Sequence, residues 1–415
     1  MSHEAPAGWR SVRLGEVAHE DRSRNADGKI PGERLVGVFK NEGMIPMRER
    51  VKGASVDRCK IVQPGAFAYN PMRINIGSIA RSAFDHAVMV SPDYVVFSAN
   101  KDVLDGSFLE HLRRSVEWDA YVGNAGDGGV RIRIYFDRLA EFRFALPPLH
   151  EQRRIAEILS SVDDGIGATR AVIEQTRTVK QGVLERLLTK GIGHTRFNQT
   201  EIGEIPEGWE VVQLSEVATV RTGLAKNKKE VPDPVDLPYL RVANVQDGYI
   251  DLADLHTIRV SRTQVERYRL VAGDVLMTEG GDFDKLGRGD VWSGIVDPCL
   301  HQNHVFAVRA DRARILPEFL ALLTASTGGK AYFQSCSKRS TNLASINSSQ
   351  VKAFPVRLPY IREQSEIVGA AEIHDATIAS LETSLKKQLL LKSSLMSDLL
   401  TGRKRVTEAL PMAAE

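Results

Sequence analysis

The most regular hydrophobic pattern in the chain is a heptad spacing that occurs twice. Apolar residues recur at alternating intervals of four and three positions after Pro148, and the same alternation follows Pro359. An average interval of 3.5 residues lines up one face of an α-helix and is typical of coiled coils. We therefore predict two long helices that pair along this seam. Its members are Ile155, Leu159, Val162, Ile166, Ile173, Val183 and Leu187 in the first helix and Ile367, Ile378, Leu381, Leu385, Leu395 and Leu399 in the second.

Polar residues interrupt both seams at matching places. Thr176 and Lys180 interrupt the first, and Gln388 and Lys392 interrupt the second. Two helices that lie independently on the surface are the alternative interpretation of this pattern. The agreement of both the apolar positions and the interruptions favours two helices that pack on each other.

Away from the two seams the hydrophobic runs are shorter. Short β-rich runs alternate with glycine-rich turns and shorter helical stretches, and this mixture predicts α+β globules. The β-rich runs lie at 94–97, 132–136 and 304–308, and the shorter helical stretches lie at 108–121 and 317–334.

Both halves of the chain share a set of landmarks. Gly8-Trp9 recurs as Gly208-Trp209, 200 positions later. Leu-Pro-Pro-Leu-His-Glu-Gln from residue 146 corresponds to Leu-Pro-Tyr-Ile-Arg-Glu-Gln from residue 358, and Leu-Leu-Thr follows both seams, each at an offset of 212. The sequences between the Gly-Trp and Leu-Pro landmarks look different. We therefore expect a duplicated frame around globules that diverged or were acquired separately.

This frame predicts the domain organisation. The expected fold class is α+β, with two mixed α/β domains and two helical segments arranged as an internal pseudo-two-fold repeat. The domains are expected at residues 1–147 and 201–357, and the helical segments at 148–200 and 358–415.

Composition narrows the class of protein. A length of 415 residues and a hydrophobic content of 42% suffice for more than one core. Three scattered cysteines fit the reducing cytoplasm better than a disulfide framework, and no apolar run is long enough to cross a membrane. We therefore expect a cytoplasmic protein without a membrane partner.

The charge balance argues against a large nucleic-acid-binding surface. The formal net charge is +2, and the four segments carry +2, +2, −1 and −1 in chain order. Any DNA-binding face must therefore be local, and acidic surface elsewhere suits a basic partner.

Motifs for catalysis or metal binding are weak. The chain has no G-x-x-x-x-G-K-[ST] phosphate loop and no acidic nuclease triplet of the common type. Tyr69-Asn70-Pro71-Met72 lacks the second proline and the aromatic residue of the adenine-methyltransferase turn, so a plain Asn-Pro turn is the better interpretation. Cys299, His301 and His304 lack a fourth ligand at a typical zinc spacing. We expect no catalytic residue and no metal.

Basic and polar residues gather in several glycine-rich loops. Arg and Lys can bind guanine, Asn can bind adenine, and Ser and Thr contact phosphates. Each loop alone is typical of solvated surface, but two such sets held apart by helices indicate DNA binding. The candidate DNA-binding residues are Arg73, Asn75, Ser78, Arg81, Arg131 and Arg133 in the first half and Lys285, Arg288, Lys338, Arg339, Thr341 and Asn342 in the second.

The landmarks, in the same order twice, resemble the specificity subunit of type I restriction–modification systems over nearly the whole chain. The Leu-Pro-Pro-Leu-His-Glu-Gln segment at 146–152 matches the family pattern. In the second copy, Tyr360 and Ile361 depart from that pattern. Residues 340–343 resemble the segment that precedes the conserved helix in many members. Residues 129–132 stand at that place in the first half.

The resemblance implies a role for each part of the chain. Each globule would be a target recognition domain that reads one half of a bipartite site in double-stranded DNA. The two helices would pair antiparallel, separate the globules and bind two modification subunits, which methylate adenine. Restriction subunits would join them. No cofactor is expected on this chain, and S-adenosylmethionine, ATP and Mg are expected on the partners.

Two other functions stay open on the sequence alone. The chain could be a non-catalytic coiled-coil scaffold that joins protein partners, or a degenerate DNA methyltransferase. Salt-dependent binding to DNA without a partner would argue against the scaffold. Failure to bind S-adenosylmethionine would remove the methyltransferase.

Overall fold

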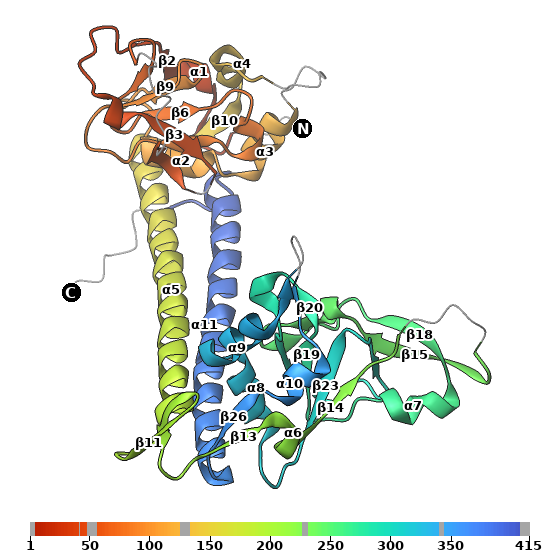
Figure 1. Cartoon of the computed structure of the whole chain (residues 1–415). Helices are drawn as coiled ribbons and strands as arrows, with labels where there is room; N and C mark the ends of the chain where they lie inside the picture. The colour runs from red at the N-terminus through yellow and green to blue at the C-terminus, as the bar shows by residue number, and fades with distance from the viewer. Residues whose placement is uncertain are drawn as a thin grey trace. The chain divides into compact units, whose positions relative to one another are not determined.

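The chain divides into two compact units. The computed structural model describes residues 5–40, 42–47, 56–124, 133–225, 231–339 and 344–406. Unit 1 comprises Met1–Arg170 and Thr383–Glu415, and unit 2 comprises Ala171–Glu382. Each unit therefore contains one globule and a part of both long helices, α5 (Leu149–Lys190) and α11 (Ile361–Leu399) (Figure 1).

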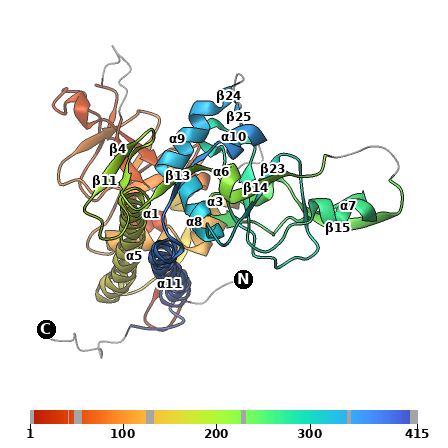
Figure 2. The same ribbon diagram turned by 60° about the horizontal axis from the view of Figure 1, so that its bottom comes forward.

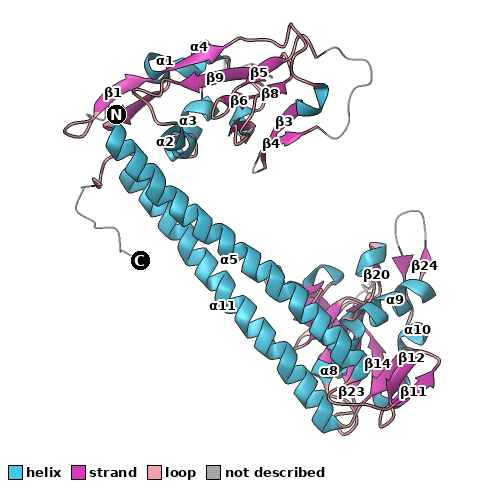
Figure 3. Cartoon of the chain, turned by 90° about the vertical axis from the view of Figure 1, so that its left-hand side faces the viewer, coloured by secondary structure: helices cyan, strands magenta, loops and turns pink. Residues whose placement is uncertain are grey.

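The globule of unit 1 mixes short helices and strands (Figure 3). Its elements are β1 (Arg10–Arg13), α1 (Leu14–Val17), β2 (Ala18–Asp21), η1 (Gly32–Arg34), β3 (Val36–Phe39), β4 (Gly43–Pro46), β5 (Lys60–Val62), β6 (Phe67–Tyr69), η2 (Ile74–Ile76), β7 (Ile79–Arg81), β8 (Val88–Val90), β9 (Val95–Ala99), α2 (Gly106–Leu112), α3 (Val116–Asn124), α4 (Phe136–Ala140) and β10 (Arg143–Leu146).

The globule of unit 2 has a similar mixture of elements. They are β11 (Phe197–Thr200), β12 (Gly203–Pro206), β13 (Glu210–Gln213), α6 (Leu214–Val217), β14 (Ala218–Thr222), β15 (Pro234–Leu240), η3 (Val242–Asn244), β16 (Val245–Gln246), β17 (Tyr249–Ile250), β18 (His256–Ser261), α7 (Arg262–Tyr268), β19 (Asp274–Thr278), β20 (Gly280–Gly281), η4 (Phe283–Lys285), β21 (Gly289–Val291), β22 (Leu300–His301), β23 (Val305–Ala310), α8 (Pro317–Ala325), α9 (Thr327–Cys336), β24 (Lys338–Arg339), β25 (Ala344–Ser345), α10 (Ser348–Lys352) and β26 (Pro355–Leu358).

The two globules share one topology. Each is built on an antiparallel four-stranded sheet, in the order β2-β9-β6-β7 in unit 1 and β14-β23-β19-β21 in unit 2. A ladder between the strand after the Gly-Trp landmark and the strand before the long helix joins the ends of each globule, as β1–β10 and β13–β26. The α+β class and the internal repeat are confirmed. Of the two origins expected for the globules, divergence and separate acquisition, the shared sheet favours divergence.

The helical layer also repeats, and the sequence carries a trace of it. Phe-Leu-x-x-Leu-x-x-Ser occurs from residue 108 and again from residue 319, where it forms α2 and α8 with the residues that follow them. Gln152 and Gln364 bind the start of these helices equivalently: their Oε1 atoms accept from the N–H of Asp105 at 2.7 Å and of Leu316 at 2.8 Å.

Three expectations for local structure differ from the fold. The stretches 108–121 and 317–334 each break into two helices, because a turn at Arg113–Ser115 and the cap residue Ser326 interrupt them. The β-rich run 132–136 forms no strand over its described residues, and Phe136 begins α4. Its apolar residues alternate, but Ile134 makes only a single backbone bond, to Pro71, and so no ladder forms.

The long helices lie side by side (Figure 2), and their chain directions are opposite within each unit (Figure 1). In unit 2, Arg177 pairs with Glu382 at 2.6 Å, while Lys180, further along α5, pairs with Asp375, earlier in α11. All of the predicted seam residues are buried or half-buried.

The lysine interruptions of the seam have a matching explanation in both units. Lys392 bonds Asp163 at 2.6 Å in unit 1, and Lys180 bonds Asp375 in unit 2. Both pairs connect α5 with α11, and their members are related by the offset of 212. A charged pair within an apolar seam restricts the helices to one register.

A buried carboxylate in the first turn of α5 joins three segments of unit 1. Glu151 is 3% exposed. Its Oε2 accepts from the indole Nε1 of Trp9 at 3.0 Å, and Arg405, which follows α11, donates to both carboxylate oxygens at 2.8 Å. Burial works to raise the pKa of Glu151, but the hydrogen bonds from Arg405 and Trp9 outweigh it and lower that pKa.

Glu363 does the same in unit 2. Its Oε2 accepts from Nε1 of Trp209 at 2.9 Å, and its Oε1 contacts the N–H of Ile192 at 2.8 Å and Nε2 of His194 at 2.9 Å. The segment after α5 therefore binds the start of α11, as the segment after α11 binds the start of α5. We call these two arrangements the Trp–Glu clamps.

We predict that Glu151→Gln destabilises the chain at neutral pH by about 2 kcal/mol, because it removes the ionised partner of Arg405 and Trp9. Since folding lowers the pKa of Glu151, its stabilisation is present above the unfolded value of 4.5 and is lost as the pH falls below it. Calorimetric unfolding at pH 7 and at pH 4 would measure the difference between wild type and variant. A difference that does not shrink at pH 4 would contradict the ionised clamp. Glu157→Gln, on the exposed side of the same helix, is the matched control and should be nearly neutral.

Candidate functional site

The turn between β6 and β7 presents polar and apolar side chains to solvent in unit 1. Arg73 and Asn75 are exposed in and before η2. Met72 and Ile76 flank them and are exposed to 46% and 56%. Apolar groups at this level of exposure between polar ones are typical of a binding surface.

Two other predicted residues support the turn from within. Ser78 is buried, and its Oγ donates to the carbonyl oxygen of Val38 at 2.8 Å. The half-buried guanidinium of Arg81 donates to Oγ of Ser107 at 2.9 Å and to the carbonyl oxygen of Gly65 at 3.3 Å. The polar atoms of Ser78 and Arg81 thus form hydrogen bonds within the globule. The exposed polar side chains, Arg73 and Asn75, belong to the turn itself.

Residues from two other segments lie beside this turn. The N–H of Ile134 donates to the carbonyl oxygen of Pro71 at 3.0 Å, which brings the exposed Arg133 to the turn. Lys40, from the β3–β4 hairpin, lies over Gly77, where an added Cβ would be 3.1 Å from its Cγ. Sequence reasoning missed Lys40 because only the fold brings the hairpin here. The unit 1 turn cluster consists of Lys40, Met72, Arg73, Asn75, Ile76 and Arg133.

The cations of this cluster are available to a ligand. Among the residues that the structure describes, no carboxylate forms an ion pair with Lys40, Arg73 or Arg133. Three unpaired cations around an amide and two apolar side chains form a surface that attracts an anion and can also contact its uncharged parts.

The corresponding turn of unit 2 joins β19 to β21. Like Gly77 in unit 1, with a φ of +94°, Gly287 adopts a positive φ, +67°, which favours glycine. Lys285 is exposed and bonds Asp282, and this hydrogen bond lowers the pKa of Asp282. Arg288 is half-buried.

The basic hairpin of unit 2 lies beside the same turn. Strand β25 lies between β20 and β24, and Lys338 on β24 is exposed. The N–H of Ile346 donates to the carbonyl oxygen of Glu279 at 2.8 Å, which repeats the bond from Ile134 to Pro71. Loops chosen separately from the sequence are thus neighbours, at the same position of the fold in both units. The unit 2 turn cluster consists of Lys285, Arg288 and Lys338.

The remaining predicted residues lie partly or wholly beyond the described part of the chain. Arg131, Thr341 and Asn342 fall outside the described residues. For Arg339 the structure describes the backbone, in β24, but not the side chain.

The weak catalytic and metal motifs have structural explanations. Burial lowers the pKa of His301 to about 4, and its Nδ1 is 2.8 Å from the carbonyl oxygen of Val305. Burial raises the pKa of Cys299 to about 12. The side chain of Asn70 accepts from the N–H of Met72 at 3.0 Å, as in an ordinary turn.

Within the described ranges, no cluster of His, Cys, Asp or Glu could hold a metal ion. No helix there is long and apolar enough to span a membrane.

Comparison with known proteins identifies one family in both halves. The family model described as type I restriction modification DNA specificity domain matches residues 6–176 and 206–391. The putative type I restriction enzyme MjaX specificity subunit of Methanocaldococcus jannaschii is 30% identical over 207 residues, 49% of this chain and 48% of that protein. The chain thus spans about half the length of this relative. The type I restriction enzyme EcoKI specificity subunit of Escherichia coli K12 is 23% identical over 90% of this chain and 78% of that protein.

Solved structures have the same fold. A chain from a structure concerned with complex assembly and conformational transition of the type I R-M system superposes with a TM-score of 0.63, at 19% identity, over 97% of this chain and all of the other. The S subunit of the type I restriction–modification system from M. genitalium gives a TM-score of 0.52 at 12% identity, over 98% and 99% of the two chains.

We predict that Ser78→Ala lowers the free energy of unfolding by about 1 kcal/mol, because it leaves a buried carbonyl oxygen without its donor. Arg73→Ala should change it by less than about 0.5 kcal/mol, because this side chain is exposed and unpaired. Urea denaturation of both variants tests the distinction. Equal destabilisation would mean that Arg73 also belongs to the structural support of the turn.

Proposed function

This chain belongs to the type I restriction modification DNA specificity family, and from that premise we propose that it is the sequence-specific DNA-binding subunit of a type I restriction–modification complex. Two relatives of the chain are named specificity subunits. In this role the chain selects the DNA sequence and carries no catalytic group or catalytic cofactor of its own.

The equivalent positions of the two turn clusters support a bipartite target. Each cluster is built around the turn between the third and fourth strands of the same sheet, yet the residues differ: Arg73 and Asn75 in the turn of unit 1, and Lys285 in the turn of unit 2 with Lys338 on the hairpin beside it. Arg or Lys can bind guanine O6 and N7, and Asn can bind adenine N6 and N7. One frame with two different sets of side chains suits a protein that reads two different half-sites.

We divide the roles among the four predicted segments. Residues 1–147 and 201–357 are the recognition domains, and residues 148–200 and 358–415 are the helical spacers. The support for this division is that each recognition segment contains one complete four-stranded sheet, and that α5 and α11 begin next to its last strand, β10 or β26.

The helix pair fits a spacer and a docking surface. The 42 residues of α5 would extend about 63 Å. Two modification subunits would bind there and methylate adenine with S-adenosylmethionine, and restriction subunits would add ATP- and Mg-dependent translocation and cleavage. The complex would act on double-stranded DNA in the cytoplasm. Mapping methylated adenines in the genome with and without this gene would test the function and identify the target.

We predict that substitutions in the two turn clusters act on different half-sites. In the complex with its modification subunits, Arg73→Ala should weaken binding to DNA that carries the half-site of unit 1 by about 5- to 150-fold, the equivalent of a lost base contact. The loss should disappear when that half-site is already replaced, whereas Lys338→Ala should show the reverse dependence. Titrations with four duplexes, intact or with either or both half-sites replaced, would measure this. Equal losses of affinity on all four duplexes would mean that these residues contact phosphates and not bases. The control is Arg22→Ala, which removes a surface cation that is already paired with Glu20 and should leave the affinity for all four duplexes unchanged.

We predict that the helix pair sets the spacer between the half-sites. A four-residue turn inserted after Arg170 and another after Glu382, where each helix passes from one unit to the other, lengthens both by about 6 Å. The preferred spacer should then grow by no more than about two base pairs at 3.4 Å each, with both half-site sequences unchanged. Methylation mapping of the variant would decide, and an altered half-site would refute the model. An insertion in one helix alone shifts the seam and should abolish binding.

A further inference from the structure

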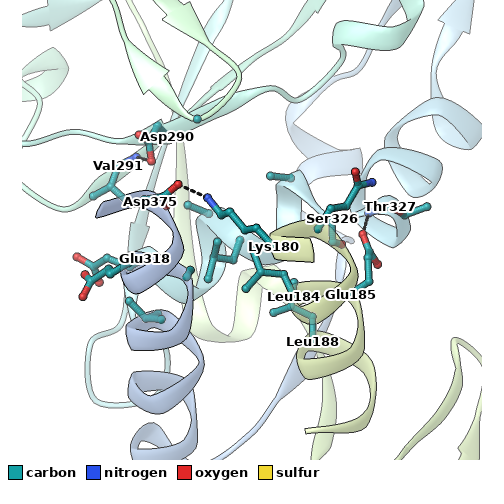
Figure 4. A pocket seen from close by; sticks show the side chains of 18 of the residues that line it. Lys180, Leu184, Glu185, Leu188, Asp290, Val291, Glu318, Ser326, Thr327 and Asp375 are labelled. Atoms are coloured by element: carbon teal, nitrogen blue, oxygen red, sulfur yellow. Dashed lines mark hydrogen bonds and ion pairs between the residues drawn. The ribbon is translucent and has the colours of Figure 1, made fainter. Parts of the chain in front are cut away.

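A cavity of about 690 Å³ lies within unit 2, where α5 and α11 meet the globule (Figure 4). Side chains of α5 and α11 form one side, and α8 and β21 form the other. Lys180 reaches from α5 to Asp375 on α11 at its edge, close to Asp290 of β21. All of the residues that line the cavity belong to unit 2.

The cavity has an excess of negative charge. Its lining includes the half-buried Asp290 and the exposed Glu318 and Glu372, and among the residues that the structure describes no cation pairs with any of them. Burial raises the pKa of Asp290, and the charges of Asp375 and Glu318 add to this effect, whereas the N–H of Val291 and the charge of Lys180 oppose it. A site in which carboxylates disfavour one another's ionisation is stabilised by an added cation.

The cations in the lining are already engaged. Lys180 is bonded to Asp375, and Lys330 is bonded to Asp247 at 2.8 Å. Arg177 is bonded to Glu174 and Glu382, each at 2.6 Å. Within the described lining, therefore, no cation is left to pair with the half-buried Asp290, and a cation from outside the lining could do so.

In unit 1 the equivalent position is occupied by side chains of the chain itself. Asp163, the counterpart of Asp375, pairs with Lys392 as expected from the repeat, but it has two further basic neighbours. NH1 of Arg114 lies 3.5 Å from its Oδ2, and Nδ1 of His111 lies 4.0 Å from the same atom. Arg114 also pairs with Glu110 at 2.6 Å, and burial lowers the pKa of His111, so Arg114 is the cation that this region contributes. Both residues come from the α2 region of the globule.

In unit 2 the corresponding residues are small or apolar. The repeated Phe-Leu-x-x-Leu-x-x-Ser segment aligns His111 with Leu322 and Arg114 with Ala325. Both of these residues line the cavity. The same alignment matches Glu110 with Ala321, so unit 2 lacks both Arg114 and one of its acidic partners, whereas it keeps Asp375, the counterpart of the other partner, Asp163.

The apolar part of the lining suits such a side chain. Leu184, Leu188, Val368 and Ala371 bring aliphatic surface into the same cavity as the carboxylates. An arginine or lysine has an aliphatic stem and a charged end, and it can bury the stem against such residues while the end pairs with acids.

We propose that this cavity receives an arginine or lysine side chain from a modification subunit, so that the partner supplies in unit 2 the cation that α2 supplies in unit 1. The inference rests on the proposed function, which provides the partner. The occupant is a protein side chain because that is what occupies the equivalent position of unit 1. The site is specific to unit 2, and the two modification subunits therefore dock by different contacts.

The first test places a cation in the cavity by a substitution in the chain itself. Ala325→Arg introduces a guanidinium at the position that corresponds to Arg114. We expect it to fold at least as stably as the wild type and to weaken binding of the purified modification subunit at unit 2 at least tenfold. The stoichiometry of the full complex, measured by sedimentation at a fixed subunit concentration, should fall from two modification subunits per chain to one.

Charge removal provides an independent variant. Asp290→Asn combined with Glu318→Gln keeps the shape of the cavity and should also weaken this binding about tenfold. The control is Glu366→Gln, an exposed carboxylate of α11 outside the lining, which should leave the affinity unchanged.

The outcomes separate the inference from the function on which it rests. If Ala325→Arg and the double variant fold normally and bind two modification subunits with wild-type affinity, the cavity is not a docking site, whereas the DNA-binding role stands. If spermidine stabilises the wild type but not the double variant, and subunit binding is unaffected, the occupant is a small polyamine and the inference is overturned. If the wild type binds neither the modification subunit nor DNA, the proposed function itself fails.

Discussion

A carboxylate in the first turn of each long helix, buried for Glu151 and half-buried for Glu363, makes the contact on which the rest of the fold depends. Glu151 and Glu363 each hold an indole N–H from the start of a globule and a polar group from the segment that leaves the other helix. A buried carboxylate is costly unless all of its partners are in place. The clamp therefore specifies, in one contact, where a globule begins, where its helix begins and where the other helix ends.

A frame fixed in this way allows its contents to vary. The sheets β2-β9-β6-β7 and β14-β23-β19-β21 have equivalent strand orders. Gln152 and Gln364 connect the long helices to the start of α2 and α8 through equivalent hydrogen bonds. The turns between the third and fourth strands differ in sequence and in charge. Residues such as Ser78, whose polar atoms form hydrogen bonds inside the globule, keep the turn in place. The exposed residues beside them can be substituted without loss of the fold, and such substitutions would change the DNA sequence that is recognised.

The same divergence reaches the junction between globule and helices. In unit 1, Lys392 and Arg114 pair with Asp163 from within the chain. In unit 2, Leu322 and Ala325 leave the acidic cavity around Asp375 and Asp290 open. The small net charge of the chain thus conceals local imbalances: exposed cations at the turns, and unpaired carboxylates where the second globule meets the helix pair. Both imbalances are suited to partners of opposite charge.

The sequence by itself determined the features that depend on local periodicity or on contiguous motifs. The heptad seam predicted both long helices, the repeated landmarks predicted two related halves, and the family resemblance carried the function. Lys40, the support role of Ser78 and Arg81, and the pairing of Lys180 with Asp375 depend on segments tens to hundreds of residues apart, and no spacing rule connects these. The repeat of α2 in α8 was present in the sequence but is too short to stand out until the sheets are aligned. Only tertiary structure decides which polar groups are consumed inside the fold, because that depends on which distant atoms arrive next to them.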